Sequence, residues 1–307
     1  MTKTVAAVPE RPASSWTSRW LSFIDETTRG DKALAGYLQR LAGYLLTGDV
    51  SEHVLVFIHG PGGTGKTVFA EAIKRAMGGY AASAPLDMFM QGRHAQHTTE
   101  IARLDGIRAA FGSEVPKKST WDLAKVKALT GGDTLAARFM RQDFFEFVPQ
   151  FKVVLVGNHK PELPSVDSSV TRRLRLVPFV HVPENPDKNL IDKINPAEVL
   201  YWALNGFTQW KTRGLAAPDT VREASKLYVA EEDTFGQWLE ERCERRIGLK
   251  ASFAELWNDY LRWNEEQKET EHLKKNEFSR ELQNRGHQKI RLTRGGGRGY
   301  AGLCLKD

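Results

Sequence analysis

The sequence predicts an α/β protein built around a parallel β-sheet. Between residues 54 and 180, short runs rich in β-branched and aromatic residues alternate with segments of helical periodicity. Such alternation is typical of a parallel sheet with helices on both faces. A glycine-rich stretch directly follows the first run, where an open parallel sheet binds its ligands. The expected strands are Val54–Ile58, Ile107–Phe111, Phe151–Val156 and Arg173–Val177.

The composition is that of an ordinary globular protein. Of the 307 residues, 41% are hydrophobic and 27% are charged, which allows a main domain and one or two smaller ones. The sequence has no apolar stretch long enough to span a bilayer and no signal-peptide core near its start, so we expect a cytoplasmic protein. The two cysteines, Cys243 and Cys304, lack metal-ligand spacing. A net charge of +6 permits nucleic-acid binding without requiring it.

The organisation along the chain changes several times. Helical periodicity precedes the alternating region and returns after it, and a further unit begins after Gly248. The expected parts are a disordered lead (1–15), a helical collar (16–50), the α/β core (51–183), a helical extension (184–247) and a C-terminal unit (248–307).

A phosphate-binding loop follows the first expected strand, because residues 60–67 read G-P-G-G-T-G-K-T. Its glycines permit backbone conformations in which successive N–H groups surround a polyphosphate at a helix N-terminus. Lys66 would neutralise the phosphates and Thr67 would ligate Mg²⁺. The alternative is a glycine-rich turn that ends in Lys-Thr, but the flanking strand and helix favour a nucleotide site. Its expected residues are Gly60, Pro61, Gly62, Gly63, Thr64, Gly65, Lys66, Thr67 and Val68.

Two further strands end in polar residues suited to hydrolysis. Glu114 follows the strand that ends near Phe111, and we expect it to orient and deprotonate the attacking water. Asp105 is the rival carboxylate, but it precedes that strand, and Glu114 could also be a solvated loop acid. Asn158 follows the next strand and is suited to hold the water without adding negative charge; a simple turn role is the alternative.

Basic residues occur in three further places. Arg172 and Arg173 would serve best when offered to the nucleotide of another subunit, although an ordinary surface pair is the alternative. Residues 134–148 are expected to form a hairpin that turns near Arg141. After Gly248, two helices and a basic β-hairpin follow the order of a winged helix, for which protein docking is the alternative to a DNA contact. Its candidate DNA contacts are Lys275, Arg280, Arg291, Arg294 and Arg298.

Taken in order, the motifs GPGGTGKT, GSE, KALTGGDTLAARFM, FEFVPQFKVVLVGNHKPELP and SSVTRRLRLVPF resemble the superfamily 3 helicases, in particular the primase-helicase branch of phages, plasmids and large DNA viruses. The resemblance covers residues 54–180. It implies an AAA+ ATPase that uses ATP and Mg²⁺, forms a ring that is usually hexameric, and translocates on single-stranded DNA. In many AAA+ proteins the second motif ends in an acidic pair, but here it is Ser113-Glu114, so Mg²⁺ would depend more on Thr67, phosphate oxygens and water.

The resemblance also implies residue roles. Lys66 and Thr67 would hold phosphate and Mg²⁺, Glu114 would be the hydrolytic acid and a metal neighbour, and Asn158 the sensor. Either Arg172 or Arg173 would be the finger that reaches a neighbouring subunit. The hairpin would project into the central channel, where Arg138 and Arg141 could hold the DNA backbone; an interface or structural role for Arg138 is equally open.

These observations predict an ATP-dependent DNA helicase of phage, plasmid or mobile-element replication, acting on single-stranded or forked DNA. Residues 1–50 could not form a primase, so we expect a stand-alone helicase or the C-terminal part of a longer primase-helicase. One rival is an AAA+ loader or remodeller that acts on a protein partner without unwinding DNA. The other is a small-molecule kinase, which the arginine pair and the basic tail disfavour.

Overall fold

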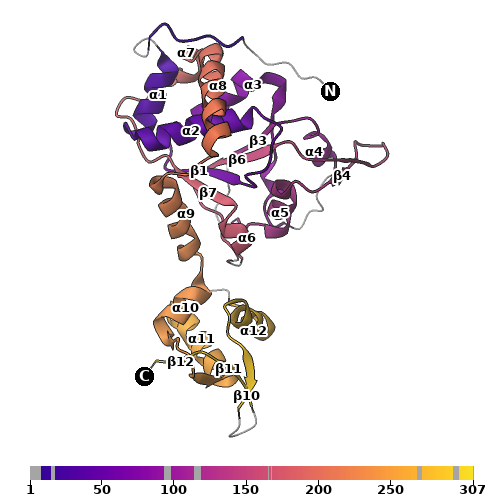
Figure 1. Cartoon of the computed structure of the whole chain (residues 1–307), viewed down its shortest axis with the longest axis vertical. Coiled ribbons are helices and arrows are strands. Elements are labelled where there is room, and N and C mark those ends of the chain that lie inside the picture. Colours follow the sequence, from indigo (N-terminus) through magenta and orange to yellow (C-terminus); the bar gives the residue numbers. More distant parts are fainter. Residues whose placement is uncertain are drawn as a thin grey trace. The chain divides into compact units, whose positions relative to one another are not determined.

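The computed structural model describes residues 8–14, 18–92, 98–113, 119–164, 166, 168–267, 272–292 and 297–306. The chain divides into two compact units, Met1–Glu232 and Asp233–Asp307, and each has its own hydrophobic core (Figure 1). Within the described ranges, every helix is too short or too polar to cross a membrane.

The first unit contains the expected parallel sheet, with strand order β2-β3-β6-β1-β7. The four expected strands are confirmed, each beginning one or two residues later than its apolar run. A fifth strand, β2, was not expected because three small residues at the sheet edge give no strand pattern. The bounds are β1 (Leu55–His59), β2 (Ala81–Ser83), β3 (Ala109–Ser113), β6 (Lys152–Gly157) and β7 (Leu174–Pro178).

Helices cover both faces of this sheet (Figure 1). Val56 and Ile58 of β1 belong to the cluster formed with α1, α2, α3 and α8, whereas Leu55 and Phe57 belong to the cluster on the opposite face, with α5 and α9. This alternation is what a strand buried on both faces requires. The helices are α1 (Arg19–Thr28), α2 (Lys32–Leu45), α3 (Lys66–Met77), α5 (Leu123–Gly131), α8 (Pro196–Arg213) and α9 (Asp219–Glu231).

The two helices of the expected collar, α1 and α2, lie directly on this core. Helix α2 approaches α8 very closely: a Cβ on Gly43 would lie 2.0 Å from the backbone nitrogen of Phe207. Shorter elements complete the unit: η1 (Gly78–Tyr80), η2 (Leu86–Met88), α4 (Thr98–Ala102), the antiparallel hairpin of β4 (Leu135–Ala137) and β5 (Phe145–Phe147), α6 (Ser168–Thr171) and α7 (Leu190–Lys193).

The second unit begins earlier than the sequence suggested. The sequence placed residues 184–247 in one helical extension, but the structure has a break after α9, and Asp233 caps α10 by accepting a 2.9 Å hydrogen bond from Gly236 N. Trp238 of α10 packs on Tyr260 and Phe278, so α10 belongs to the C-terminal core. The elements are α10 (Thr234–Arg242), β8 (Cys243–Glu244), β9 (Lys250–Ser252), α11 (Phe253–Gln267), α12 (Lys275–Asn284), β10 (Lys289–Arg291), β11 (Arg298–Ala301) and β12 (Cys304–Leu305).

Candidate nucleotide-binding site

The glycine-rich loop connects β1 to α3 as the motif requires. Gly65 has a φ of 84°, and a Cβ there would lie 2.6 Å from the ring of Phe23. At Gly60, a Cβ would lie 1.8 Å from the carbonyl oxygen of Phe179. A side chain at Gly65 would strain the backbone, and a side chain at either position would clash with a neighbour. The loop therefore requires glycine at both positions.

Lys66 is buried in this loop, with only 5% of its surface exposed. Its ammonium group donates hydrogen bonds to the carbonyl oxygens of Gly60 (2.8 Å) and Pro61 (2.5 Å) and to Oγ1 of Thr64 (3.1 Å). Burial lowers the pKa of Lys66 below its ordinary value because the charged form loses water. The loop thus holds a cation in place, and an anion entering the loop would replace neutral carbonyl partners with charged ones.

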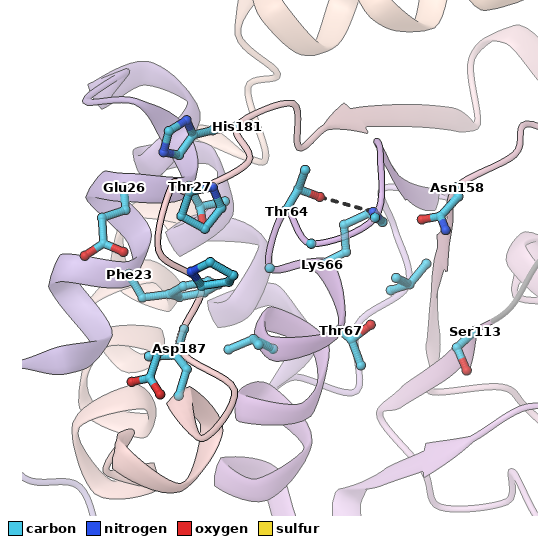
Figure 2. A pocket seen from close by; sticks show the side chains of 18 of the residues that line it. Phe23, Glu26, Thr27, Thr64, Lys66, Thr67, Ser113, Asn158, His181 and Asp187 are labelled. Carbon is cyan, nitrogen blue, oxygen red and sulfur yellow. Dashed lines mark hydrogen bonds between the residues drawn. The ribbon is translucent and has the colours of Figure 1, made fainter.

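The ends of two strands line the same pocket as the loop. Ser113 ends β3, and Asn158 directly follows β6, which lies between β3 and β1 in the sheet. Figure 2 shows Asn158, Ser113 and Thr67 on one side of the loop. Glu114 lies outside the described residues, but the chain reaches it directly from Ser113. Asp105 precedes β3 and does not line this pocket.

The other side of the pocket comes from elements that the sequence did not connect with the loop. Phe23, Glu26 and Thr27 of α1 face it, as do His181 and Asp187 from the segment after β7 (Figure 2). The pocket has a volume of about 630 Å³. Of these five side chains, Phe23 is aromatic and the others are polar or charged, so this side offers one apolar surface among hydrogen-bonding groups. The sequence did not indicate that α1 lines the pocket, because the helical periodicity of α1 is explained by its packing on the core.

Arg172 and Arg173 lie at the opposite edge of the sheet. They immediately precede β7, and Leu174 pairs with Leu55 at the start of β1, whereas the phosphate loop follows the end of β1. Five strand residues span about 16 Å, so the structure does not bring this pair to the pocket of its own chain. Arg172 is exposed, but Arg173 is half-buried and donates a 2.9 Å hydrogen bond to the carbonyl oxygen of Ser169.

The expected hairpin is confirmed, with Ala136 opposite Glu146 in the β4–β5 pair. Arg138 and Arg141 are both exposed beyond these strands. The guanidinium of Arg138 lies 4.7 Å from the ring centre of Phe144, which is 59% exposed. Arg141 has a φ of 61°, as a residue in a tight turn does. Both arginines are therefore available to a partner.

The basic residues of the second unit are also on its surface. Lys275 and Arg280 on α12 are exposed, as are Arg291 and Arg298, which face each other directly across the β10–β11 pair. Two like charges at opposed positions destabilise a sheet unless an anion lies near them. Arg294 lies outside the described residues.

Comparison with known proteins finds a family of unknown function and relatives named as viral helicases. Residues 58–173 match DUF5906, a family of unknown function. The chain is 25% identical over 258 residues to "Putative helicase L207/L206" of Acanthamoeba polyphaga mimivirus, covering 76% of this chain and 27% of that protein. It is 27% identical over 266 residues to "Putative helicase 022R" of Frog virus 3, covering 78% of this chain and 27% of that one. The chain therefore spans about a quarter of these relatives.

The fold also resembles solved structures. An apo structure of the NrS-1 C-terminal region matches with a TM-score of 0.59 at 11% identity, covering 98% of this chain and 79% of that one. A second apo structure of the same region matches with a TM-score of 0.57 at 13% identity, covering 98% of this chain and 78% of that one. At such identities the likeness shows the fold, and the viral relatives support a helicase-like function.

Proposed function

We propose that this chain is an ATP-dependent DNA helicase of superfamily 3 with an AAA+ core, which works as a homo-hexameric ring on single-stranded or forked DNA in viral, plasmid or mobile-element replication. The observation that carries the proposal is the pocket that joins Lys66 and Thr67 of the phosphate loop to the ends of β3 and β6. Strand β6 lies between the strand that leads into the loop and the strand that leads to Glu114. The relatives named as helicases support the same conclusion.

Within this proposal, the loop of residues 60–68 holds the phosphates of ATP and the Lys66 ammonium neutralises them. Thr67 ligates Mg²⁺, Glu114 activates the attacking water, and Asn158 holds that water near the γ-phosphate. The side of the pocket that contains Phe23 accommodates the base and sugar, since it lies across the loop from Asn158.

The positions of Arg172 and of the pocket at opposite edges of the sheet support the proposed ring. Arg172 is exposed at the edge away from its own pocket, so it is suited to serve the pocket of a neighbouring subunit. We favour Arg172 over Arg173 as the finger, because Arg173 already has a structural hydrogen bond to Ser169. A cation held in trans stabilises charge that develops in the transition state only after subunits assemble.

DNA contacts come from two surfaces. In the hairpin, Arg138 and Arg141 bind phosphates, and the exposed Phe144 offers a ring on which a base can stack. In the second unit, the described order α10, β9, α11, α12, β10 and β11, with β11 between β9 and β10, supports the proposal of a winged helix. Its helix α12 supplies Lys275 and Arg280, and its wing supplies Arg291 and Arg298; Arg294 lies between these two in the sequence.

The proposal is tested by measuring ATP turnover with and without single-stranded DNA, together with displacement of one strand from a forked duplex. Wild-type protein is expected to hydrolyse ATP faster with DNA and to separate the strands, whereas Glu114→Gln should bind ATP and do neither. The native mass measured with an ATP analogue and DNA should be that of a hexamer. ATP turnover without strand displacement, stimulated instead by a protein, would make the chain a loader or remodeller.

The DNA contact of the wing has its own test. The double variant Arg291→Ala, Arg298→Ala should lower the slope of log binding constant against log salt by about 1.4 to 1.8, because two phosphate contacts are lost. Lys306→Ala is the matched control, since Lys306 lies in the same unit and donates to the carbonyl oxygen of Glu240. An unchanged slope in the double variant would leave protein docking as the role of this unit.

A further inference from the structure

The last turn of helix α9 binds the segment that follows Asn158. The Tyr228 hydroxyl donates a hydrogen bond to the carbonyl oxygen of Pro161. The Glu232 carboxylate accepts one from Leu163 N at 2.9 Å, and Lys160 donates one of 2.5 Å to Glu231. The side chain of Tyr228 is fully buried. Helix α9 therefore fixes the backbone only three residues beyond Asn158.

The same hydroxyl binds a second segment that begins at the pocket. Trp121, 2% exposed, donates a 2.7 Å hydrogen bond from Nε1 to the Tyr228 oxygen. Its backbone N–H donates to the carbonyl oxygen of Glu162 at 3.0 Å. The chain reaches Trp121 from Ser113, at the end of β3, through the residues that include Glu114. One tyrosine oxygen thus joins the segments that leave β3 and β6.

The position of Tyr228 makes this oxygen hard to replace. Both of its hydrogen-bond partners are fixed in the protein, and water has no access to a residue that is 0% exposed. Removing the hydroxyl would leave the Trp121 N–H without its acceptor and the Pro161 carbonyl without its donor. The backbone hydrogen bond between Trp121 and Glu162 would remain, but the segment after Asn158 would lose its anchor to helix α9 at Pro161 while the core around the ring stays filled.

We propose that Tyr228 is a positioning residue for ATP hydrolysis: its hydroxyl anchors the segment that follows Asn158 to helix α9 and so holds Asn158 in place at the end of β6. This inference rests on the proposed ATPase function of the pocket. Tyr228 acts through this segment and does not line the pocket. Because water attack is sensitive to the placement of Asn158, while phosphate binding depends on the loop of residues 60–67, loss of the hydroxyl lowers kcat and leaves KM unchanged.

The test compares Tyr228→Phe with Tyr44→Phe. Tyr44 is also fully buried in the same unit, and its hydroxyl accepts a 3.3 Å hydrogen bond from Glu52 N. It contacts Lys152 at the start of β6, the end opposite to Asn158. Tyr228→Phe is expected to lower kcat for ATP about tenfold with KM changed less than about twofold. Tyr44→Phe should keep both constants, although its melting temperature should fall by about as much as that of Tyr228→Phe.

A second pair of variants separates positioning from general damage to the helix. Glu232→Gln keeps an oxygen that can accept from Leu163 N and should retain kcat, whereas Glu232→Ala loses that oxygen and should lower kcat as Tyr228→Phe does. A kcat of Tyr228→Phe equal to that of wild type, while Lys66→Ala is inactive, would overturn this inference alone. Absence of ATP turnover in wild-type protein would overturn the proposed function and the inference together.

Discussion

Two lysines are buried at opposite edges of the same sheet. Lys66 follows the carboxyl edge and is 5% exposed; Lys152 begins β6 at the amino edge and is 4% exposed. Each donates hydrogen bonds to backbone carbonyls, and for each the loss of water lowers the pKa. Burial and hydrogen bonding therefore do not distinguish them.

Their surroundings do distinguish them. Lys66 lines the 630 Å³ pocket, and the helix that begins with it points its N-terminus toward that space. Lys152 is enclosed by the carbonyl oxygens of Thr47 and Gln150, and its ammonium lies 5.0 Å from the ring centre of Tyr44. A buried cation signals ligand binding only where a cavity gives an anion access to it. We interpret Lys66 as functional and Lys152 as structural.

The largest expected difference between the two lysines is in catalysis. Lys66→Ala should lower ATP turnover at least about a hundredfold, because the phosphates lose their principal cation. Lys152→Met should change turnover less than about twofold. ATP should raise the melting temperature of wild-type protein and of Lys152→Met but not that of Lys66→Ala. A loss of turnover in Lys152→Met with its folding intact would contradict the division between the edges.

The sequence predicted one side of the pocket and missed the other. The loop could be read because its glycines and Lys66 stand in a fixed local spacing, and Asn158 because it ends an apolar strand. Phe23 could not be read as a pocket residue, since its contact with Gly65 joins positions far apart in the chain. Tyr228 gave no signal for the same reason: its partners Trp121 and Pro161 are 107 and 67 residues away.

The division between the edges also predicts how subunits cooperate. Arg172→Ala should lower turnover about a hundredfold when every subunit carries the substitution, because the proposed finger is then absent from every neighbour. Mixed with Lys66→Ala in equal amounts, it should recover activity toward about a quarter of the wild-type level, since a quarter of random interfaces have both residues intact. Turnover and native mass of the mixture are measured together. Unrecovered activity in normally assembled mixed rings would exclude a role for Arg172 in trans.

Arg173→Ala sharpens this comparison. Arg173 donates its hydrogen bond to Ser169 within its own chain and is half-buried. Its removal should lower the free energy of unfolding of the first unit by about 1 kcal/mol or more, as the loss of a hydrogen bond from a charged donor does. Mixing with Lys66→Ala should not restore that loss. Chemical denaturation of the separate variant measures it, and a stability equal to wild type would make Arg173 a second candidate for the finger.

The last comparison concerns the pH dependence of stability at the amino edge. Burial, aided by the nearby Arg108 and opposed by Asp49, lowers the pKa of Lys152 to about 7 from an ordinary value of 10.5. Below pH 7 the folded and unfolded chains both hold this proton, so the penalty for burying the charge is fully present. As the pH rises from about 7 toward 10.5, the folded chain releases the proton while the unfolded chain keeps it. Stability should therefore rise with pH over this range, by up to about 1.4 kcal/mol per pH unit.

Lys152→Met removes this titration and provides the reference that cancels the contributions of other groups. The free energy of unfolding of each protein is measured in urea at pH 6, 7 and 9. From pH 7 to pH 9 the wild-type protein should gain about 1 to 3 kcal/mol relative to Lys152→Met, and from pH 6 to pH 7 much less. A difference between the two proteins that stays constant from pH 6 to pH 9 would show that Lys152 keeps its proton in the folded state. The carbonyl oxygens around Lys152 would then stabilise its charge as fully as water does, and the two buried lysines would differ only in their access to a ligand.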